Sequence, residues 1–192
     1  MKIRALTLIV ALSSTAAAQI DYGGGLPLAG ESFQAQSGST VVLDAVTGDA
    51  GLVVVFWSSV CPWADRYEAR LSELMDTYTP AGIGFVLVDS GDPALEDGSA
   101  APPEPSTLPA PVIADTDGRL ADAFSARSTP HIFFFGPDQT LLYDGTLDDS
   151  PAARERVRTP YLALAMDQSI AGLPVEIQRT QAFGCTIKRA GE

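Results

Sequence analysis

The strongest constraint in the sequence is an apolar run followed by an amphipathic segment and a second apolar run. Residues 52–57 read Leu-Val-Val-Val-Phe-Trp, apolar on both faces, which is typical of a buried parallel strand. Residues 62–79 carry apolar side chains at helical spacing, and residues 83–88 form the second run. A strand, a helix and a strand in this order predict a right-handed parallel crossover, so we expect an α/β fold.

The predicted helix begins at Pro62, directly after the first of the two cysteines in the chain. Proline is favoured at the first helical position, and Asp65 and Glu68 complement the positive end of the helix dipole. Cys61 therefore faces unpaired backbone N–H groups, which favour the thiolate, the nucleophilic form of cysteine. The alternative is an inert buried thiol, because free cysteine is among the most buried residue types.

The rest of the chain predicts shorter elements. A β-rich stretch is expected over residues 40–44, and Thr159-Pro160 is the expected cap and first turn of the last helix. Six prolines between residues 92 and 111 predict an acidic surface loop without a regular element. The other predicted elements are a helix over 120–124, paired strands over 131–135 and 140–143, a helix over 161–170, and an extended tail over 175–188.

Residues 1–18 predict a secretory signal peptide. Lys2 and Arg4 precede an apolar run over residues 5–12, and Ala16-Ala17-Ala18 forms a cleavage pattern. The run is far shorter than the ~20 residues that a membrane-spanning helix needs. We expect an exported protein, periplasmic or secreted, in a compartment where disulfides persist. The alternative is a short hydrophobic anchor or a buried N-terminal strand.

Three segments resemble a known superfamily. Residues 56–64, Phe-Trp-Ser-Ser-Val-Cys-Pro-Trp-Ala, resemble the active-site segment of thioredoxins, where a strand ending in Phe-Trp leads to Cys-x-x-Cys. Ser128-Thr129-Pro130 resembles the cis-proline loop that faces that cysteine. Residues 182–188, Ala-Phe-Gly-Cys-Thr-Ile-Lys, resemble the tail of peroxiredoxin-like, redoxin-domain proteins of the alkyl hydroperoxide reductase/thiol-specific antioxidant type.

The resemblance implies a thioredoxin fold, in which a central mixed sheet is flanked by helices. An N-terminal β extension and an extended C-terminal tail are expected in addition. The implied organisation is a flexible segment over 19–32, a thioredoxin-like domain over 33–172 and a tail over 173–192 that carries Cys185.

The chain also departs from the family patterns. Ala64 stands where thioredoxins have their second cysteine, and Val55 stands where they have a buried aspartate. A local dithiol exchange is therefore impossible. Ser58 satisfies half of the peroxiredoxin pattern, but Val54 replaces its proline. The peroxidatic cysteine of peroxiredoxins corresponds to position 64 and not to Cys61.

The sequence and the resemblance together suggest a thiol oxidoreductase. In an exported chain two cysteines are more often paired than free, so Cys185 is the expected partner of Cys61. Cys61 would be the nucleophile and Cys185 the resolving residue. Two alternatives remain: a thiol peroxidase that uses Cys61, and a non-catalytic binding module in which the Cys61–Cys185 disulfide is structural.

The expected partners are a thiol or disulfide protein, or a peroxide, together with an external thiol reductant. A net charge of −12 argues against nucleic-acid binding. The reaction requires no organic cofactor or metal, and no membrane span is expected after signal cleavage. Residues expected to bind substrate are Trp57, Pro62, Trp63, Thr129 and Pro130, and residues expected to tune the thiol are Ser58, Arg66, Arg127 and His131.

Overall fold

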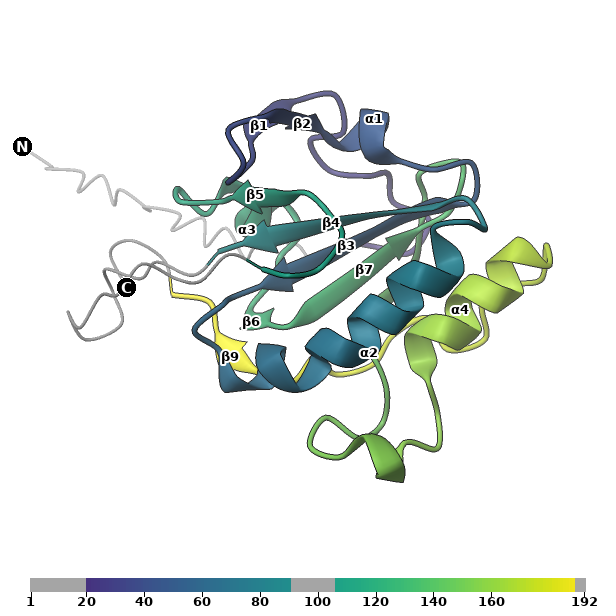
Figure 1. Cartoon of the computed structure of the whole chain (residues 1–192). Helices are drawn as coiled ribbons and strands as arrows, with labels where there is room; N and C mark the ends of the chain where they lie inside the picture. Colours follow the sequence, from purple (N-terminus) through teal and green to yellow (C-terminus); the bar gives the residue numbers. More distant parts are fainter. Residues whose placement is uncertain (1–19, 91–105, 189–192) are drawn as a thin grey trace, which may run out of the picture.

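A five-stranded mixed sheet forms the centre of the protein (Figure 1). The computed structural model describes residues 20–90 and 106–188, so the predicted signal peptide and most of the predicted loop over 92–111 lie outside it. The strand order is β5-β4-β3-β7-β8. The strands are β3 (Gly51–Trp57), β4 (Ile83–Asp89), β5 (Val112–Ala114), β7 (His131–Phe135) and β8 (Leu141–Gly145). This arrangement confirms the expected thioredoxin fold.

Strand β3 lies at the middle of the sheet, as its sequence predicts. It pairs in parallel with β4 and antiparallel with β7, and all seven of its residues are buried. Its side chains alternate between two cores. Val53, Val55 and Trp57 belong to the core that contains Cys61, whereas Leu52 and Phe56 belong to the core on the opposite face.

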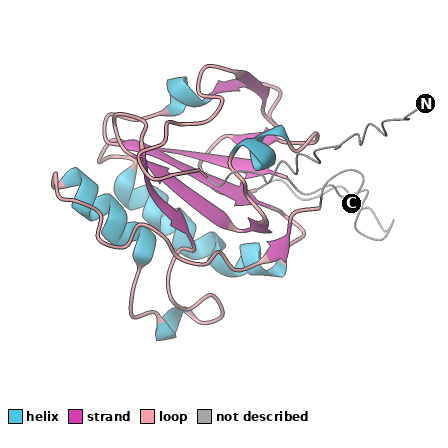
Figure 2. Ribbon diagram, turned by 180° about the vertical axis from the view of Figure 1, so that it is seen from behind, coloured by secondary structure: helices cyan, strands magenta, loops and turns pink. Residues whose placement is uncertain are grey.

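Helices cover both faces of the sheet (Figures 1 and 2). Helix α2 (Pro62–Tyr78) connects β3 to β4, and α2 and α4 (Tyr161–Ile170) pack on the core that contains Cys61. The short helices α1 (Leu43–Val46) and α3 (Arg119–Ala123) contribute to the other core. Strands β1 (Ser32–Gln34) and β2 (Thr40–Val42) form a separate antiparallel pair, and η1 (Arg154–Arg156) is a turn of 3-10 helix before α4.

The structure differs from two local predictions. The β-rich stretch expected over residues 40–44 ends at Val42, where α1 begins, and the first residue of α1, Leu43, is fully buried in the second core. The N-cap of α4 is Pro160 and not Thr159, and no side chain caps this helix. The backbone N–H of Leu164 donates to the carbonyl oxygen of Pro160 at 3.0 Å, and the helix itself covers residues 161–170 as predicted.

The C-terminal tail is attached along the edge of strand β8. The backbone N–H of Asp144 donates to Gln178 at 2.9 Å, and the N–H of Thr180 donates to Asp144 at 3.0 Å. Gly145 has a φ of +143°, and a Cβ atom there would lie 2.1 Å from Oγ1 of Thr180. This close approach requires glycine. The tail predicted to be extended over 175–188 forms only one regular strand, β9 (Cys185–Thr186).

Candidate redox site

Cys61 occupies the position between strand β3 and helix α2 that the sequence predicts. It is the N-cap residue of α2, with an extended backbone at φ −88° and ψ 115°. Its N–H donates to the carbonyl oxygen of Ser58 at 3.1 Å, and its own carbonyl oxygen accepts the N–H of Ala64 at 2.9 Å. The residue is only 2% exposed. Cys61 therefore lies at the positive end of α2, in a position largely shielded from water.

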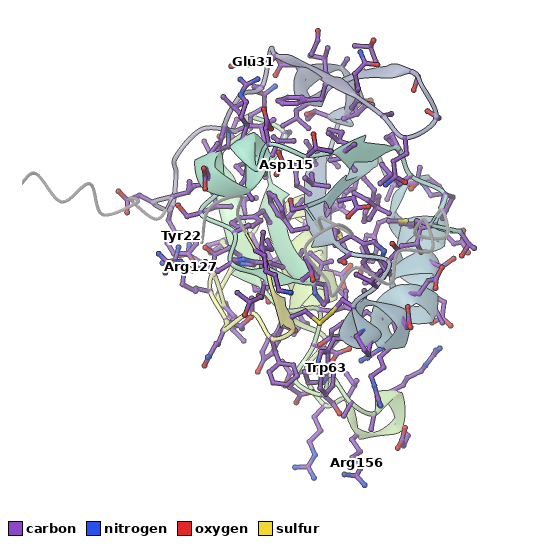
Figure 3. The ribbon with its side chains drawn as sticks, turned by 90° about the vertical axis from the view of Figure 1, so that its left-hand side faces the viewer. Tyr22, Glu31, Trp63, Asp115, Arg127 and Arg156 are labelled. Atoms are coloured by element: carbon purple, nitrogen blue, oxygen red, sulfur yellow. A yellow bond between two sulfur atoms is a disulfide. The ribbon has the colours of Figure 1, made fainter. Side chains whose placement is uncertain are left out.

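Cys61 and Cys185 form a disulfide, drawn in yellow in Figure 3. Their Cα atoms are 6.0 Å apart, and 124 positions separate them in the sequence. Cys185 is only partly buried, so it is the more accessible of the two residues. The pairing expected for the two cysteines is present.

A two-strand pairing brings Cys185 to this position. Strand β9 pairs antiparallel with β6 (Ser128–Thr129), and Cys185 lies directly opposite Thr129. The N–H of Ile187 donates to the carbonyl oxygen of Arg127 at 3.0 Å and extends this pairing by one bond. The Thr129–Pro130 peptide bond is cis, as the resemblance implies. The sulfur of Cys61 lies 3.1 Å from the carbonyl oxygen of Thr129, which can accept a hydrogen bond from the reduced thiol.

Two of the predicted substrate-binding residues lie at the surface around the disulfide. Pro62 is exposed, and the half-buried Trp63 packs edge-to-face on Phe183 of the tail with ring centroids 4.6 Å apart. Phe183 is itself 47% exposed. Trp57 is 3% exposed and belongs to the same core as Cys61, so it does not lie at the surface. Apolar side chains therefore border the disulfide on the outside.

The side chains of the predicted tuning residues are directed elsewhere. Arg66 is exposed, donates to the carbonyl oxygen of Ala152 at 3.2 Å and lies over Trp63. Arg127 is exposed and lines a cavity of about 520 Å³ with His131. Ser58 is buried, and its carbonyl oxygen is its contact with Cys61. Of the expected influences on the thiol, the N-terminus of α2 is the one that adjoins Cys61.

His131 lies on the face of the sheet opposite Cys61. Its ring packs on Phe133, which belongs to the second core, with centroids 4.3 Å apart. Desolvation, with a smaller contribution from the charge of Arg179, lowers the pKa of His131 to about 4. Its Nδ1 is buried without a hydrogen-bond partner. His131 is therefore neutral near pH 7 and supplies no charge that would stabilise the Cys61 thiolate.

Two ion pairs with buried carboxylates were not expected from the sequence. Arg179 of the tail makes a bidentate pair with the buried carboxylate of Asp144, with its Nη2 2.7 Å from Oδ2. Arg70 of α2 is buried and donates to the buried carboxylate of Asp148. The first pair attaches the tail to β8, and the second attaches the loop after β8 to α2. Arg70 adjoins Leu71 of the apolar face, but its position in the helix pattern suits an exposed arginine equally well, so the sequence carried no signal for this pair.

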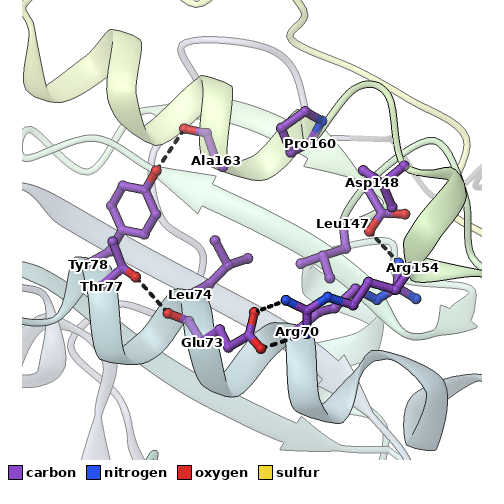
Figure 4. A pocket seen from close by; sticks show the side chains of 11 residues that line it. Arg70, Glu73, Leu74, Thr77, Tyr78, Leu147, Asp148, Arg154, Pro160 and Ala163 are labelled. Carbon is purple, nitrogen blue, oxygen red and sulfur yellow. Dashed lines mark hydrogen bonds and ion pairs between the residues drawn. The ribbon is translucent and has the colours of Figure 1, made fainter.

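A second cavity, of about 400 Å³, lies between α2, α4 and the segment before α4 (Figure 4). Leu74, Tyr78 and Leu147 give it apolar walls, and the exposed Glu73–Arg154 pair lies at its rim. No cysteine lines this cavity. Within residues 20–90 and 106–188, no group of three or more His, Cys, Asp and Glu side chains is arranged to hold a metal ion. No helix in the same ranges is long and apolar enough to cross a membrane.

A mixed sheet, a cysteine at the N-terminus of the first long helix and a facing cis-proline define a thioredoxin-like protein. The family model described as AhpC/TSA family matches residues 28–144, more than half of the chain, and the chain belongs to this family. The match ends before the C-terminal tail. Cys185 and its strand therefore lie outside the part of the chain that the family model describes.

Solved structures show the same fold over most of the chain. An uncharacterized conserved protein from Geobacillus kaustophilus is 27% identical, with a TM-score of 0.77 over 91% of this chain and 95% of that one. A hypothetical protein from Sinorhizobium meliloti 1021 is 23% identical, with a TM-score of 0.76 over 91% and 98%. A putative thiol:disulfide interchange protein DsbE from Chlorobium tepidum is 17% identical, with a TM-score of 0.54 over 80% and 98%. A search of the curated proteins returned no match.

Proposed function

We propose that this protein is an exported thiol–disulfide oxidoreductase in which Cys61 and Cys185 form the redox-active pair. The observation that carries the proposal is the disulfide between the N-cap residue of α2 and a partly exposed cysteine on a strand beside the cis-proline. Thiol–disulfide chemistry needs an accessible disulfide and a stabilised leaving thiolate. Export fits the predicted signal peptide and a compartment in which disulfides persist.

The reaction has three stages. The thiolate of reduced Cys61 attacks one sulfur of a substrate disulfide, which forms a mixed disulfide and releases the other substrate sulfur as a thiolate. Cys185 then attacks the sulfur of Cys61, forms the internal disulfide and releases the second substrate thiolate. An external dithiol finally donates two electrons and two protons to the internal disulfide. The positive end of α2 stabilises Cys61 whenever it attacks or leaves.

Regeneration should start at Cys185. An external thiolate reaches the partly exposed Cys185 more easily than Cys61, which is 2% exposed. Attack at Cys185 expels Cys61 as the thiolate beside the helix N-terminus, and a stabilised thiolate is the better leaving group. Exposure and leaving-group stability therefore favour the same sulfur as the point of attack.

Cysteine variants test the proposal. We expect the wild-type chain to catalyse the reduction of insulin disulfides by dithiothreitol, and Cys61→Ser to reduce this rate to the uncatalysed level. Cys185→Ser should instead accumulate a mixed disulfide at Cys61, because the second exchange is blocked. Mass spectrometry of acid-quenched reactions distinguishes the two variants. Full activity in Cys61→Ser would overturn the proposal.

A peroxidase is the second candidate, favoured by membership of the AhpC/TSA family. In that reaction Cys61 reduces the peroxide and becomes a sulfenic acid, and Cys185 condenses with it to form the disulfide and water. Stopped-flow measurement of hydrogen peroxide consumption separates the candidates. A rapid reaction that survives Cys185→Ser favours the peroxidase, whereas a rate close to that of free cysteine favours disulfide exchange.

A further inference from the structure

In the oxidised state the chain's own tail occupies strand β6, which is already expected to contact substrate, and from the contacts of this tail the structure assigns a local sequence to the partner segments. This inference rests on the proposed function and adds the partner's local sequence. Residues 183–187 of the tail read Phe-Gly-Cys-Thr-Ile. The pattern is therefore an aromatic residue, glycine, cysteine, one unrestricted position and an aliphatic residue. We infer that partner segments with this pattern exchange with the tail on β6.

The pairing of β9 with β6 has the form of a peptide added to the edge of a sheet. Thr129 and Cys185 are opposite each other in an antiparallel register, and their strands contain two residues each. The backbone hydrogen bonds of this pairing and the Cys61–Cys185 disulfide both join the tail to the site. Edge addition draws affinity from main-chain hydrogen bonds, which any extended segment can supply, and specificity from the pockets for alternate side chains.

Three positions of the tail make contacts that restrict which residue can stand there. Phe183, two residues before the cysteine, packs on Trp63. At position 184 a Cβ atom would lie 1.9 Å from the carbonyl oxygen of Thr129, so only glycine allows the strand to approach. Ile187, two residues after the cysteine, is 4% exposed and belongs to the second core. A partner segment that meets these requirements can place its own cysteine on Cys61.

Exchange of the tail links docking to the second step of the reaction. A partner segment disulfide-bonded to Cys61 occupies β6, so Cys185 is displaced from it. When Cys185 attacks Cys61, a new bond forms between these sulfurs, the bond from Cys61 to the partner breaks, and the partner leaves as a thiolate. The tail then recovers its pairing with β6, and product release and disulfide formation become one event.

Peptide thiols provide the test. Full-length Cys185→Ser, carrying thionitrobenzoate on Cys61 as a mixed disulfide, is mixed with the capped peptide Ala-Phe-Gly-Cys-Thr-Ile. The peptide thiolate attacks Cys61 and releases thionitrobenzoate, which is followed by absorbance. One matched control peptide carries Gly184→Ala, and another carries serine at the positions of Phe183 and Ile187. The rate of each peptide with a free aromatic disulfide corrects for its intrinsic thiol reactivity.

We expect the native peptide to react with saturation and about tenfold faster than either control peptide, since the controls lose backbone pairing or apolar contacts. Equal corrected rates for the three peptides would overturn the inference. If Cys61-dependent insulin reduction persists alongside equal rates, the proposed function stands and the docking pattern alone fails.

Discussion

Replacement of Arg70 by methionine is expected to lower the free energy of unfolding by about 3–5 kcal/mol, because it leaves a buried carboxylate without its cation. Asp148 is 3% exposed, and Arg70 is 8% exposed. The guanidinium also donates to the carbonyl oxygens of Ser150 and Pro151, each at 3.1 Å. The variant therefore removes several bonds that hold the loop after β8 against α2. Urea denaturation followed by circular dichroism measures the loss.

Two further variants show whether burial of the charge is the cause. Arg154→Met removes the exposed ion pair with Glu73 on the same side of the molecule and should change stability little, because water screens such pairs. Arg70→Met combined with Asp148→Leu should recover much of the loss, since no unpaired charge then remains buried. A loss in Arg70→Met as small as that in Arg154→Met would contradict this explanation.

Acidification from pH 7 to pH 4 is expected to destabilise the protein through His131 by about 3 kcal/mol beyond the contribution of the carboxylates. The pKa of this residue falls from 6.5 to about 4 on folding, chiefly because of desolvation. The unfolded chain therefore binds a proton near pH 6.5, whereas the folded chain binds it only near pH 4. The stabilisation is complete above pH 6.5 and is lost as the pH falls through this window.

His131→Gln isolates this effect, because His131 is the only histidine in the chain. Glutamine does not titrate, so the variant should lose less stability than the wild type between pH 6.5 and pH 4. The free energy of unfolding is measured by urea titration at several pH values, and the two slopes are compared. Parallel slopes would show that burial does not lower the pKa of His131 in the folded protein.

The sequence was sufficient to predict the elements that carry the redox site. The apolar run in β3 is buried on both faces and could lie only at the centre of a sheet. Pro62 marks the first residue of α2, which places Cys61 at the helix N-terminus. The Ser-Thr-Pro segment and the late cysteine were recognised by resemblance. Their contact required coordinates, since no local pattern shows that β9 pairs with β6.

The sequence did not show which charges are buried. Arg70 fits a helical surface as well as a buried pair, and its partner Asp148 lies 78 positions later. Asp144 similarly depends on Arg179 of the tail, 35 positions away. Such pairs depend on tertiary contacts between segments with no common periodicity. The orientation of His131 could not be predicted either, because strand alternation defines two faces of the sheet but does not say which face this side chain occupies.

The reduction potential of the Cys61–Cys185 pair tests the central claim most directly. On chain-entropy grounds, closing a loop of this length stabilises the oxidised protein by about 4–5 kcal/mol, which lowers the potential. Stabilisation of the Cys61 thiolate by α2 favours the reduced protein and raises it. The protein is equilibrated with dithiothreitol or glutathione buffers, quenched with acid, alkylated and weighed by mass spectrometry. We predict a potential above about −300 mV, as in catalytic disulfides, whereas a value below about −300 mV would identify a structural disulfide and contradict the account.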